Sequence, residues 1–265
     1  MRNAIIASLS PSYPWKELVQ YFPTISSTND VLKTLARQGA PQGTVLVAGH
    51  QTAGHGRMGR SFHSPEGMGI YLSILLRPDC APTELMHLTC AAAVAMCDAV
   101  EKAAGFRPGI KWTNDLVCGK RKLGGILTEL GLSHRGTVDW CLVGIGINCC
   151  QKEADFPEDI RTIAASLNMV TGRDISPAHV AAAMLEALQQ MDAMLLTEQE
   201  AILRQYRRDC ITIGQEISVV RGADIRHGKA LSVDDAGALV VCYEDGTQEA
   251  VNSGEVSIRG MYGYI

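Results

Sequence analysis

The chain of 265 residues is long enough for one large and one small domain, and its 46% hydrophobic and 20% charged residues are ordinary for a globular protein. Its formal net charge of −4 argues against general electrostatic binding of nucleic acid, which needs a basic face. No apolar run approaches the roughly 18–20 residues of a membrane span, and the N-terminus lacks a convincing signal-peptide cleavage site, so we expect a cytoplasmic protein without a membrane partner.

The predicted elements follow from hydrophobic periodicity and from capping residues. In chain order they are a helix at 24–40, strands at 44–49 and 69–78, a helix at 83–105, strands at 109–112, 123–130 and 139–149, and helices at 175–195 and 198–209. Thr83 is expected to cap the second helix and Gly105 to end it. Ser176 and Pro177 occupy the N-cap and first helical positions of the third.

The residue pattern changes at Gly214. From there on, short and partly alternating runs are separated by Asp-Gly and similar turns, which favours a small β-barrel or SH3-like module. The predicted fold class is α+β: a mixed β-sheet domain flanked by helices, followed by a small all-β domain. We expect an N-terminal lead-in over residues 1–23, the larger domain over 24–209 and the SH3-like domain over 212–265.

Nine cysteines are scattered along the chain without a C-x-x-C pair, so the sequence predicts neither a zinc ribbon nor a thioredoxin-like motif. Most lie in apolar segments, where a free cysteine behaves as a small hydrophobic residue. His87 and Cys90 fall on one helical face, but two ligands do not make a metal site. We therefore expect no metal ion held by protein side chains.

The stretch QTAGHGRMGR, at residues 51–60, satisfies the dinucleotide-binding spacing G-x-G-x-x-G. That motif must open a helix, and the following residues, RSFHSPEGMG, contain Pro65 and two glycines that exclude one. A basic glycine loop remains, in which Arg57 and Arg60 offer guanidinium groups to phosphate or carboxylate. The alternative is a solvated surface loop.

A second polar stretch lies at 110–130 between two apolar strands. It holds six charged or amide side chains: Lys111, Asn114, Asp115, Lys120, Arg121 and Lys122. Such a turn could place an ammonium and a carboxylate beside an anionic substrate, and Gly124 and Gly125 remove side chains where a flat ligand could lie. A charged hairpin explains the cluster equally well.

Two shorter stretches complete the set. Residues 142–150 form an apolar strand in which Gly144 and Gly146 leave room and which ends near Asn148, although packing glycines would give the same pattern. The sequence SSTND at 26–30 offers hydroxyls and free amides to an anion or a polar ring. Helix capping alone explains that stretch as well.

Taken together, the motifs and their order resemble biotin–protein ligase from about Thr24 onward. The family's G-R-G-R-x-G-R loop stands as GHGRMGR, and its other motifs stand as KWTNDL, RKLGGILTE, GIGIN and STN, with a small C-terminal β-module. The resemblance implies a class II synthetase-like catalytic domain. Only 23 residues precede the STN-containing segment that begins at Thr24, so we expect the short form without the N-terminal DNA-binding domain, and no DNA binding.

The resemblance implies ATP-dependent attachment of biotin, via biotinyl-5′-AMP, to a lysine of a biotin carboxyl carrier protein domain, with Mg²⁺ accompanying ATP. The implied catalytic residues are Lys122, Arg57 and Asp115. Biotin is expected to contact Ser27, Thr28, Asn29, Gln51, His55, Gly56, Arg57, Lys122, Gly124 and Gly125. ATP or adenylate is expected to contact Arg57, Arg60, Phe62, Lys111, Asn114 and Asn148.

One position departs from the family pattern. His55 stands where the family commonly has arginine, which puts a bidentate phosphate or carboxylate contact there in doubt. Two alternatives stay open: a lipoate or octanoate ligase of related fold, and a non-catalytic biotin-binding module. The resemblance allows a homodimer through exposed strands of the central sheet.

Overall fold

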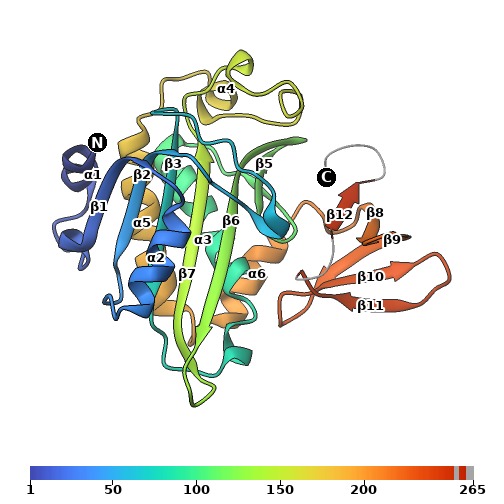
Figure 1. Ribbon diagram of the computed structural model, residues 1–265. Helices are drawn as coiled ribbons and strands as arrows, with labels where there is room; N and C mark the ends of the chain where they lie inside the picture. Colours follow the sequence, from blue (N-terminus) through green and yellow to red (C-terminus); the bar gives the residue numbers. More distant parts are fainter. Residues whose placement is uncertain (254–256, 261–265) are drawn as a thin grey trace.

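The computed structural model describes residues 1–253 and 257–260, so residues 254–256 and 261–265 of the predicted C-terminal domain lie outside the described residues. Two sheets organise the chain (Figure 1). The larger has the strand order β1-β2-β3-β7-β6-β5-β4, with β1 parallel to β2 and the other pairs antiparallel. The smaller is antiparallel, with the order β11-β10-β9-β8-β12. The predicted fold class is thus confirmed.

The bounds of the elements are as follows. The large sheet consists of β1 (Val19–Ile25), β2 (Val45–Gln51), β3 (Gly69–Leu76), β4 (Gly109–Lys111), β5 (Asp115–Cys118), β6 (Arg121–Leu132) and β7 (Val138–Asn148). The small sheet consists of β8 (Glu216–Arg221), β9 (Asp224–Val233), β10 (Leu239–Tyr243), β11 (Gln248–Val251) and β12 (Ser257–Gly260). The α-helices are α1 (Arg2–Ser8), α2 (Thr28–Arg37), α3 (Leu88–Ala104), α4 (Leu167–Thr171), α5 (Pro177–Met194) and α6 (Gln199–Asp209).

Helices cover the two faces of the large sheet unequally. The main core lies between the sheet and α3, α5 and α6, whereas α2 packs on the opposite face (Figure 1). Because successive side chains of a strand point to opposite faces, Ile74 joins the main core and Leu75 packs under α2. The candidate site lies on this second face, beside α2.

The apolar segment Pro82–Ala104 is long enough by length and composition to cross a membrane, but 72% of its most apolar window is buried. In this fold it supplies α3, whose side chains fill the main core. Burial of this kind is typical of a central core helix.

The N-terminal residues take part in the larger fold. Ile5, Leu9 and Tyr13 are buried in the main core, and β1 is the edge strand of the large sheet. The predicted domain boundary between residues 23 and 24 stays a prediction. Strand β1 extends across this boundary. The helix expected at 24–40 is shorter than predicted, because residues 19–25 pair with β2 and the helix begins at Thr28.

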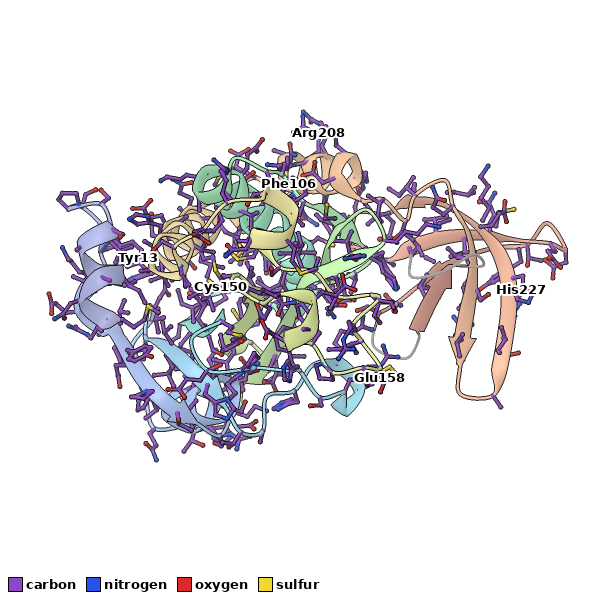
Figure 2. All side chains as sticks on the ribbon, turned by 90° about the horizontal axis from the view of Figure 1, so that it is seen from above. Tyr13, Phe106, Cys150, Glu158, Arg208 and His227 are labelled. Atoms are coloured by element: carbon purple, nitrogen blue, oxygen red, sulfur yellow. The ribbon has the colours of Figure 1, made fainter. Side chains whose placement is uncertain are left out.

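The small sheet is anchored to the large domain at Trp112, which follows β4. The Trp112 backbone N–H donates to Thr212 Oγ1 at 2.9 Å, and its indole N–H donates to the Gly237 carbonyl at 3.0 Å. Figure 2 shows the small sheet at one end of the molecule, where His227 of β9 lies, and Tyr13 toward the opposite end. Trp112 lies within the polar stretch 110–130 and thereby ties the small sheet to it.

Arg107 is expected to be a strong stability determinant, because it joins α3 to α6. Its guanidinium donates to Asp209 at 2.6 Å, and the Asp209 side chain is only 8% exposed. Arg107→Met would remove the close cation from this buried carboxylate and leave it only the more distant Arg208, whose Nε is 3.9 Å from Asp209 Oδ1. We therefore expect the free energy of unfolding to fall by about 1–3 kcal/mol in urea denaturation. Arg204→Met is the matched control: its 2.6 Å pair with Glu200 is largely exposed, and a loss below about 0.5 kcal/mol is expected. Equal losses in the two variants would contradict this role.

Candidate functional site

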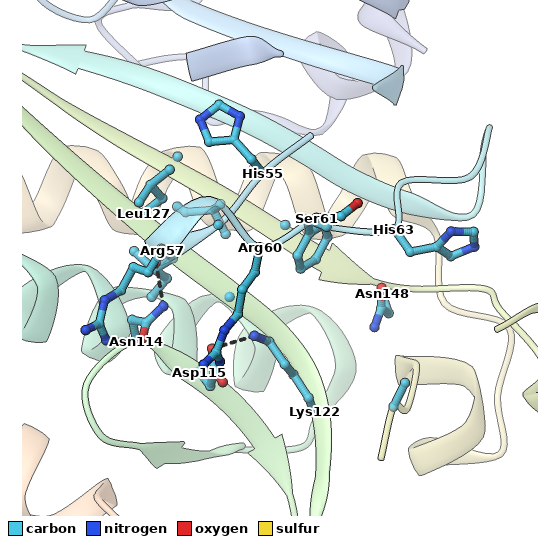
Figure 3. Close-up of a pocket in the computed structure, with 18 of the residues that line it drawn as sticks. His55, Arg57, Arg60, Ser61, His63, Asn114, Asp115, Lys122, Leu127 and Asn148 are labelled. Atoms are coloured by element: carbon cyan, nitrogen blue, oxygen red, sulfur yellow. Dashed lines mark hydrogen bonds and ion pairs between the residues drawn. The ribbon is translucent and has the colours of Figure 1, made fainter. Parts of the chain in front are cut away.

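A pocket of about 310 Å³ opens on the α2 face of the large sheet (Figure 3). Its lining includes every predicted site residue except Gly124. A Cβ on Gly124 would lie 2.4 Å from the Gly146 carbonyl oxygen, so this glycine serves the close approach of β6 to β7. The four separated stretches singled out in the sequence therefore converge on one cavity. The ligand contact predicted for each of these residues stays a prediction.

One end of the pocket is a buried polar corner at the start of α2. Ser27 caps the helix, with its Oγ accepting from the Asp30 N–H at 3.3 Å. The Thr28 N–H and hydroxyl both donate to Gln51 Oε1, at 2.9 and 3.1 Å. Ser27 and Thr28 are buried, and such fixed hydroxyl and amide groups suit a small polar ring in an otherwise apolar slot.

The glycine stretch is a small folded hairpin. His55 and Ser61 face each other across an antiparallel bridge, and the Gly56 N–H donates to the Arg60 carbonyl at 2.7 Å. Its tip, η2 (Arg57–Gly59), is a single 3-10 turn and opens no α-helix, in agreement with the rejection of a dinucleotide motif. At its base, a Cβ on Gly54 would lie 2.9 Å from Gln51 Nε2, so glycine there makes room for the Gln51 side chain.

The other end of the pocket gathers cations around one carboxylate. Lys122 Nζ lies 2.6 Å from Asp115 Oδ1, and Figure 3 shows Arg60 reaching toward this pair from the glycine hairpin. Lys111 is also buried in the lining. Four cations, the fourth being Arg57, thus face one acidic side chain in the described lining, and the excess positive charge favours an anionic ligand.

Arg57 is held between two parts of the chain. Its guanidinium donates to Asn114 Oδ1 at 3.1 Å and to the carbonyl of Ser253 from the C-terminal module. Asn114 in turn donates to the Ile126 carbonyl at 2.8 Å. Burial lowers the pKa of Arg57, while the nearby Asp115 carboxylate acts in the opposite direction. Arg57 is therefore held in place by both the large domain and the C-terminal module.

The glycines of β7 each make room for a specific side chain. A Cβ on Gly146 would lie 2.4 Å from the Phe62 ring, which also makes an edge contact with Tyr71 at 6.2 Å between centroids. A Cβ on Gly144 would lie 2.0 Å from Asn29 Oδ1. Asn148, at the end of the strand, donates to the Ala165 carbonyl at 3.0 Å and accepts from Gln151 at 3.1 Å.

His55 lies at the rim of the pocket. Its Nδ1 is 3.2 Å from the Ala53 carbonyl and 3.8 Å from the Asp30 carboxylate. Figure 3 shows its ring directed away from the Lys122 and Asp115 pair. Its neighbours are thus at the α2 end of the pocket, away from the cations.

Part of the pocket wall comes from a segment that sequence patterns did not indicate. The Lys122 backbone pairs with Ala164, because its N–H donates to the Ile163 carbonyl at 2.7 Å and its carbonyl accepts from the Ala165 N–H at 2.8 Å. Further apolar lining comes from Phe156, Ile160, Leu127 and Ile258. The 156–164 segment has no helix or strand periodicity, so only the tertiary pairing reveals it.

Comparison with known proteins agrees with this architecture. Residues 21–148 match the Biotin/lipoate A/B protein ligase family, and residues 212–259 match the Biotin protein ligase C terminal domain. The biotin–(acetyl-CoA-carboxylase) ligase of Mycobacterium tuberculosis is 30% identical over 90% of this chain and 87% of its own length. The Bifunctional ligase/repressor BirA of Bacillus subtilis is 36% identical over 86% of this chain and 70% of its own.

Among solved structures, the biotin protein ligase from Aquifex aeolicus in complex with biotin and ATP superposes with a TM-score of 0.77. The two proteins are 29% identical, and the match covers 91% of this chain and 98% of the other. Both the catalytic fold and the C-terminal module are therefore shared with proteins of one enzyme family. The chain belongs to the biotin protein ligase family, and it is a ligase.

Proposed function

We propose that the protein attaches biotin, via biotinyl-5′-AMP, to one lysine of a biotin carboxyl carrier protein domain. The observation that carries this proposal is the pairing, in one pocket, of a buried polar corner with a cluster of cations around Lys122 and Asp115. The corner suits the ureido ring of biotin, and the cations suit its carboxylate and the phosphates of ATP. The similarity to a ligase that binds biotin and ATP supports it.

In the first step the biotin carboxylate attacks the α-phosphate, and pyrophosphate leaves. Two anions must approach each other, so cations fixed at the point of approach lower the barrier. Lys122 takes this role, because it lies on β6 with its Nζ inside the pocket and is held by Asp115. Arg57 and Arg60 reach the same space from the glycine hairpin and neutralise further phosphate charge.

In the second step the neutral amine of the carrier lysine attacks the acyl carbon, and AMP leaves. Asp115 is the one acidic side chain in the described pocket lining. When Lys122 turns to the acyl-phosphate oxygens, the Asp115 carboxylate orients the incoming ammonium and accepts a proton from it. The glycine hairpin covers the mixed anhydride and slows its hydrolysis.

Mg²⁺ is proposed to enter with ATP. Among residues 1–253 and 257–260, no group of three or more His, Cys, Asp or Glu side chains could hold a metal ion. We therefore propose that phosphate oxygens and water hold most of the ion's coordination positions. Asp115 is the carboxylate in the pocket lining that could contribute a further oxygen. The ion would supply positive charge to the phosphates.

The proposal is tested by incubating the protein with ATP, biotin and a purified carrier domain. We expect mass spectrometry to show one added biotinyl group on a single carrier lysine, and none when that lysine is replaced by arginine. A carrier that stays unmodified while the protein consumes ATP and biotin would refute the transfer step. The cytoplasmic location, the absence of DNA and membrane partners, and the homodimer stay predictions.

Arg57→Gly is expected to release biotinyl-AMP into solution, whereas His55→Arg is expected to leave turnover largely intact. The reason is position: Arg57 joins the hairpin to Asn114 and to the C-terminal module, while His55 lies at the rim. Free biotinyl-AMP is measured by chromatography during turnover without a carrier, and a rise of about tenfold is expected for Arg57→Gly alone. Equal release from the two variants would contradict the distinction.

A further inference from the structure

A chain of hydrogen bonds runs from the surface of the molecule to the polar corner of the pocket. Lys33 of α2 pairs with Glu129 Oε1, and Glu129 Oε2 accepts from Asn29 Nδ2 at 3.0 Å. Asn29 Oδ1 is hydrogen-bonded to Ser73 Oγ, and Ser73 Oγ lies 2.7 Å from Thr28 Oγ1. Ser73 is fully buried in the middle of the apolar strand β3. Neither Glu129 nor Ser73 belongs to the described lining of the pocket.

The chemistry of these groups determines where each hydrogen lies. A carboxylate only accepts, so the Asn29 amide must present Nδ2 to Glu129 and Oδ1 to Ser73. Because Oδ1 carries no hydrogen, the single hydroxyl hydrogen of Ser73 is committed to Asn29. Gln51 is fixed in the same way, since the Thr28 N–H requires the Gln51 oxygen opposite it.

The polar corner therefore offers more hydrogen-bond acceptors than hydrogen-bond donors. Three oxygens meet there: Ser73 Oγ, Thr28 Oγ1 and Gln51 Oε1, at 2.7 and 3.1 Å from one to the next. Between them they share only the Thr28 hydroxyl hydrogen, and Gln51 Oε1 receives the Thr28 N–H as well. Such a corner attracts a ligand that donates an N–H and disfavours one that offers only acceptors or hydrocarbon.

We propose that Glu129, acting through Asn29 and Ser73, is a positioning and specificity-determining residue that makes this corner an acceptor of ligand N–H groups. This inference rests on the proposed function, in which the ligand N–H belongs to the ureido ring of biotin. It gives Asn29 a positioning role, because both of its amide heavy atoms are already bound to neighbours. It also provides a reason for rejecting lipoate and octanoate, whose acyl groups carry no N–H.

Glu129→Gln is expected to reverse the donor-to-acceptor direction of this chain of hydrogen bonds. Lys33 needs an acceptor, so it takes the Gln oxygen and leaves the Gln NH₂ facing Asn29. Asn29 then turns its oxygen to residue 129 and its NH₂ to Ser73, and the released Ser73 hydrogen fills the acceptor corner. The double variant Glu129→Gln/Asn29→Asp restores the original direction. The carboxylate introduced at position 29 accepts from the Gln NH₂ on one side and from the Ser73 hydroxyl on the other.

The test measures binding of biotin by calorimetry, together with binding of two analogues, each methylated on one ureido nitrogen. For Glu129→Gln we expect about 5- to 15-fold weaker binding of biotin than for the unsubstituted protein. The analogue that lacks the N–H facing Thr28 should bind Glu129→Gln and the unsubstituted protein equally well. The double variant is expected to bind biotin within about threefold of the unsubstituted protein. Asp139→Asn is the control, because its ion pair with Arg77 lies on the same sheet without a link to the corner, and its binding should not change.

Equal weakening of biotin and both analogues by Glu129→Gln would mean general damage and would overturn the inference. A double variant no better than Glu129→Gln would overturn it as well. Both results leave the proposed function intact if the unsubstituted protein binds biotin. Failure of the unsubstituted protein to bind biotin would refute the proposed function and this inference together.

Discussion

Lys122→Met is expected to lower the rate of biotinyl-AMP formation by about 10²–10³-fold while leaving the protein folded. Lys122 is the cation that β6 holds inside the pocket, 2.6 Å from Asp115. Its loss removes positive charge from the point where carboxylate and α-phosphate meet, and it leaves Asp115 to repel both anions. The measurement is single-turnover formation of biotinyl-AMP at saturating biotin and ATP.

Lys102→Met is the matched control for this substitution. Lys102 makes an ion pair of the same length, 2.6 Å, with Glu186, and its own side chain is 66% exposed on α3, away from the pocket. It should retain full activity. A Lys122→Met protein that forms biotinyl-AMP at the unsubstituted rate would contradict the catalytic role of Lys122.

Gly144→Ala is expected to weaken biotin binding by about 10- to 100-fold and to lower the free energy of unfolding by about 1–3 kcal/mol. The added methyl group would lie 2.0 Å from Asn29 Oδ1, so Asn29 must move and give up its bonds to Glu129 and Ser73. Calorimetry and urea denaturation measure the two effects.

A double variant separates the steric effect from the loss of hydrogen bonds. Gly144→Ala/Asn29→Ala removes the clash, so much of the stability should return. The binding of biotin should stay weak, because the Ser73 hydroxyl has lost its acceptor and turns back to Thr28. Unchanged affinity in Gly144→Ala would contradict the importance of the Asn29 position.

Much of the site could be predicted because its motifs are local in sequence. Glycines 144 and 146 signalled missing side chains in a core strand, and the structure shows that Asn29 and Phe62 occupy the space. The dinucleotide motif could be rejected from Pro65 and the following glycines, since a helix cannot contain them. In these cases the local properties of glycine and proline were sufficient for the prediction.

The rest depends on tertiary contacts that leave no local trace. A lone serine in an apolar strand gives no indication that Ser73 faces Asn29, and Glu129 carries the ordinary pattern of a partly exposed strand residue. The pocket-lining segment 156–164 is held by backbone pairing between Lys122 and Ala164. The hydrophobic periodicity of the sequence does not indicate this pairing. Strand β1 was hidden because its parallel partner, β2, follows only after an intervening helix.

Biotin-dependent exchange of labelled pyrophosphate into ATP tests the central claim most directly, because it reports acyl-adenylate formation in this pocket without a carrier. We expect rapid exchange with biotin and only background exchange with lipoate or octanoate at the same concentration. Exchange that is absent with biotin, or equally fast with lipoate or octanoate, would contradict the proposed reaction.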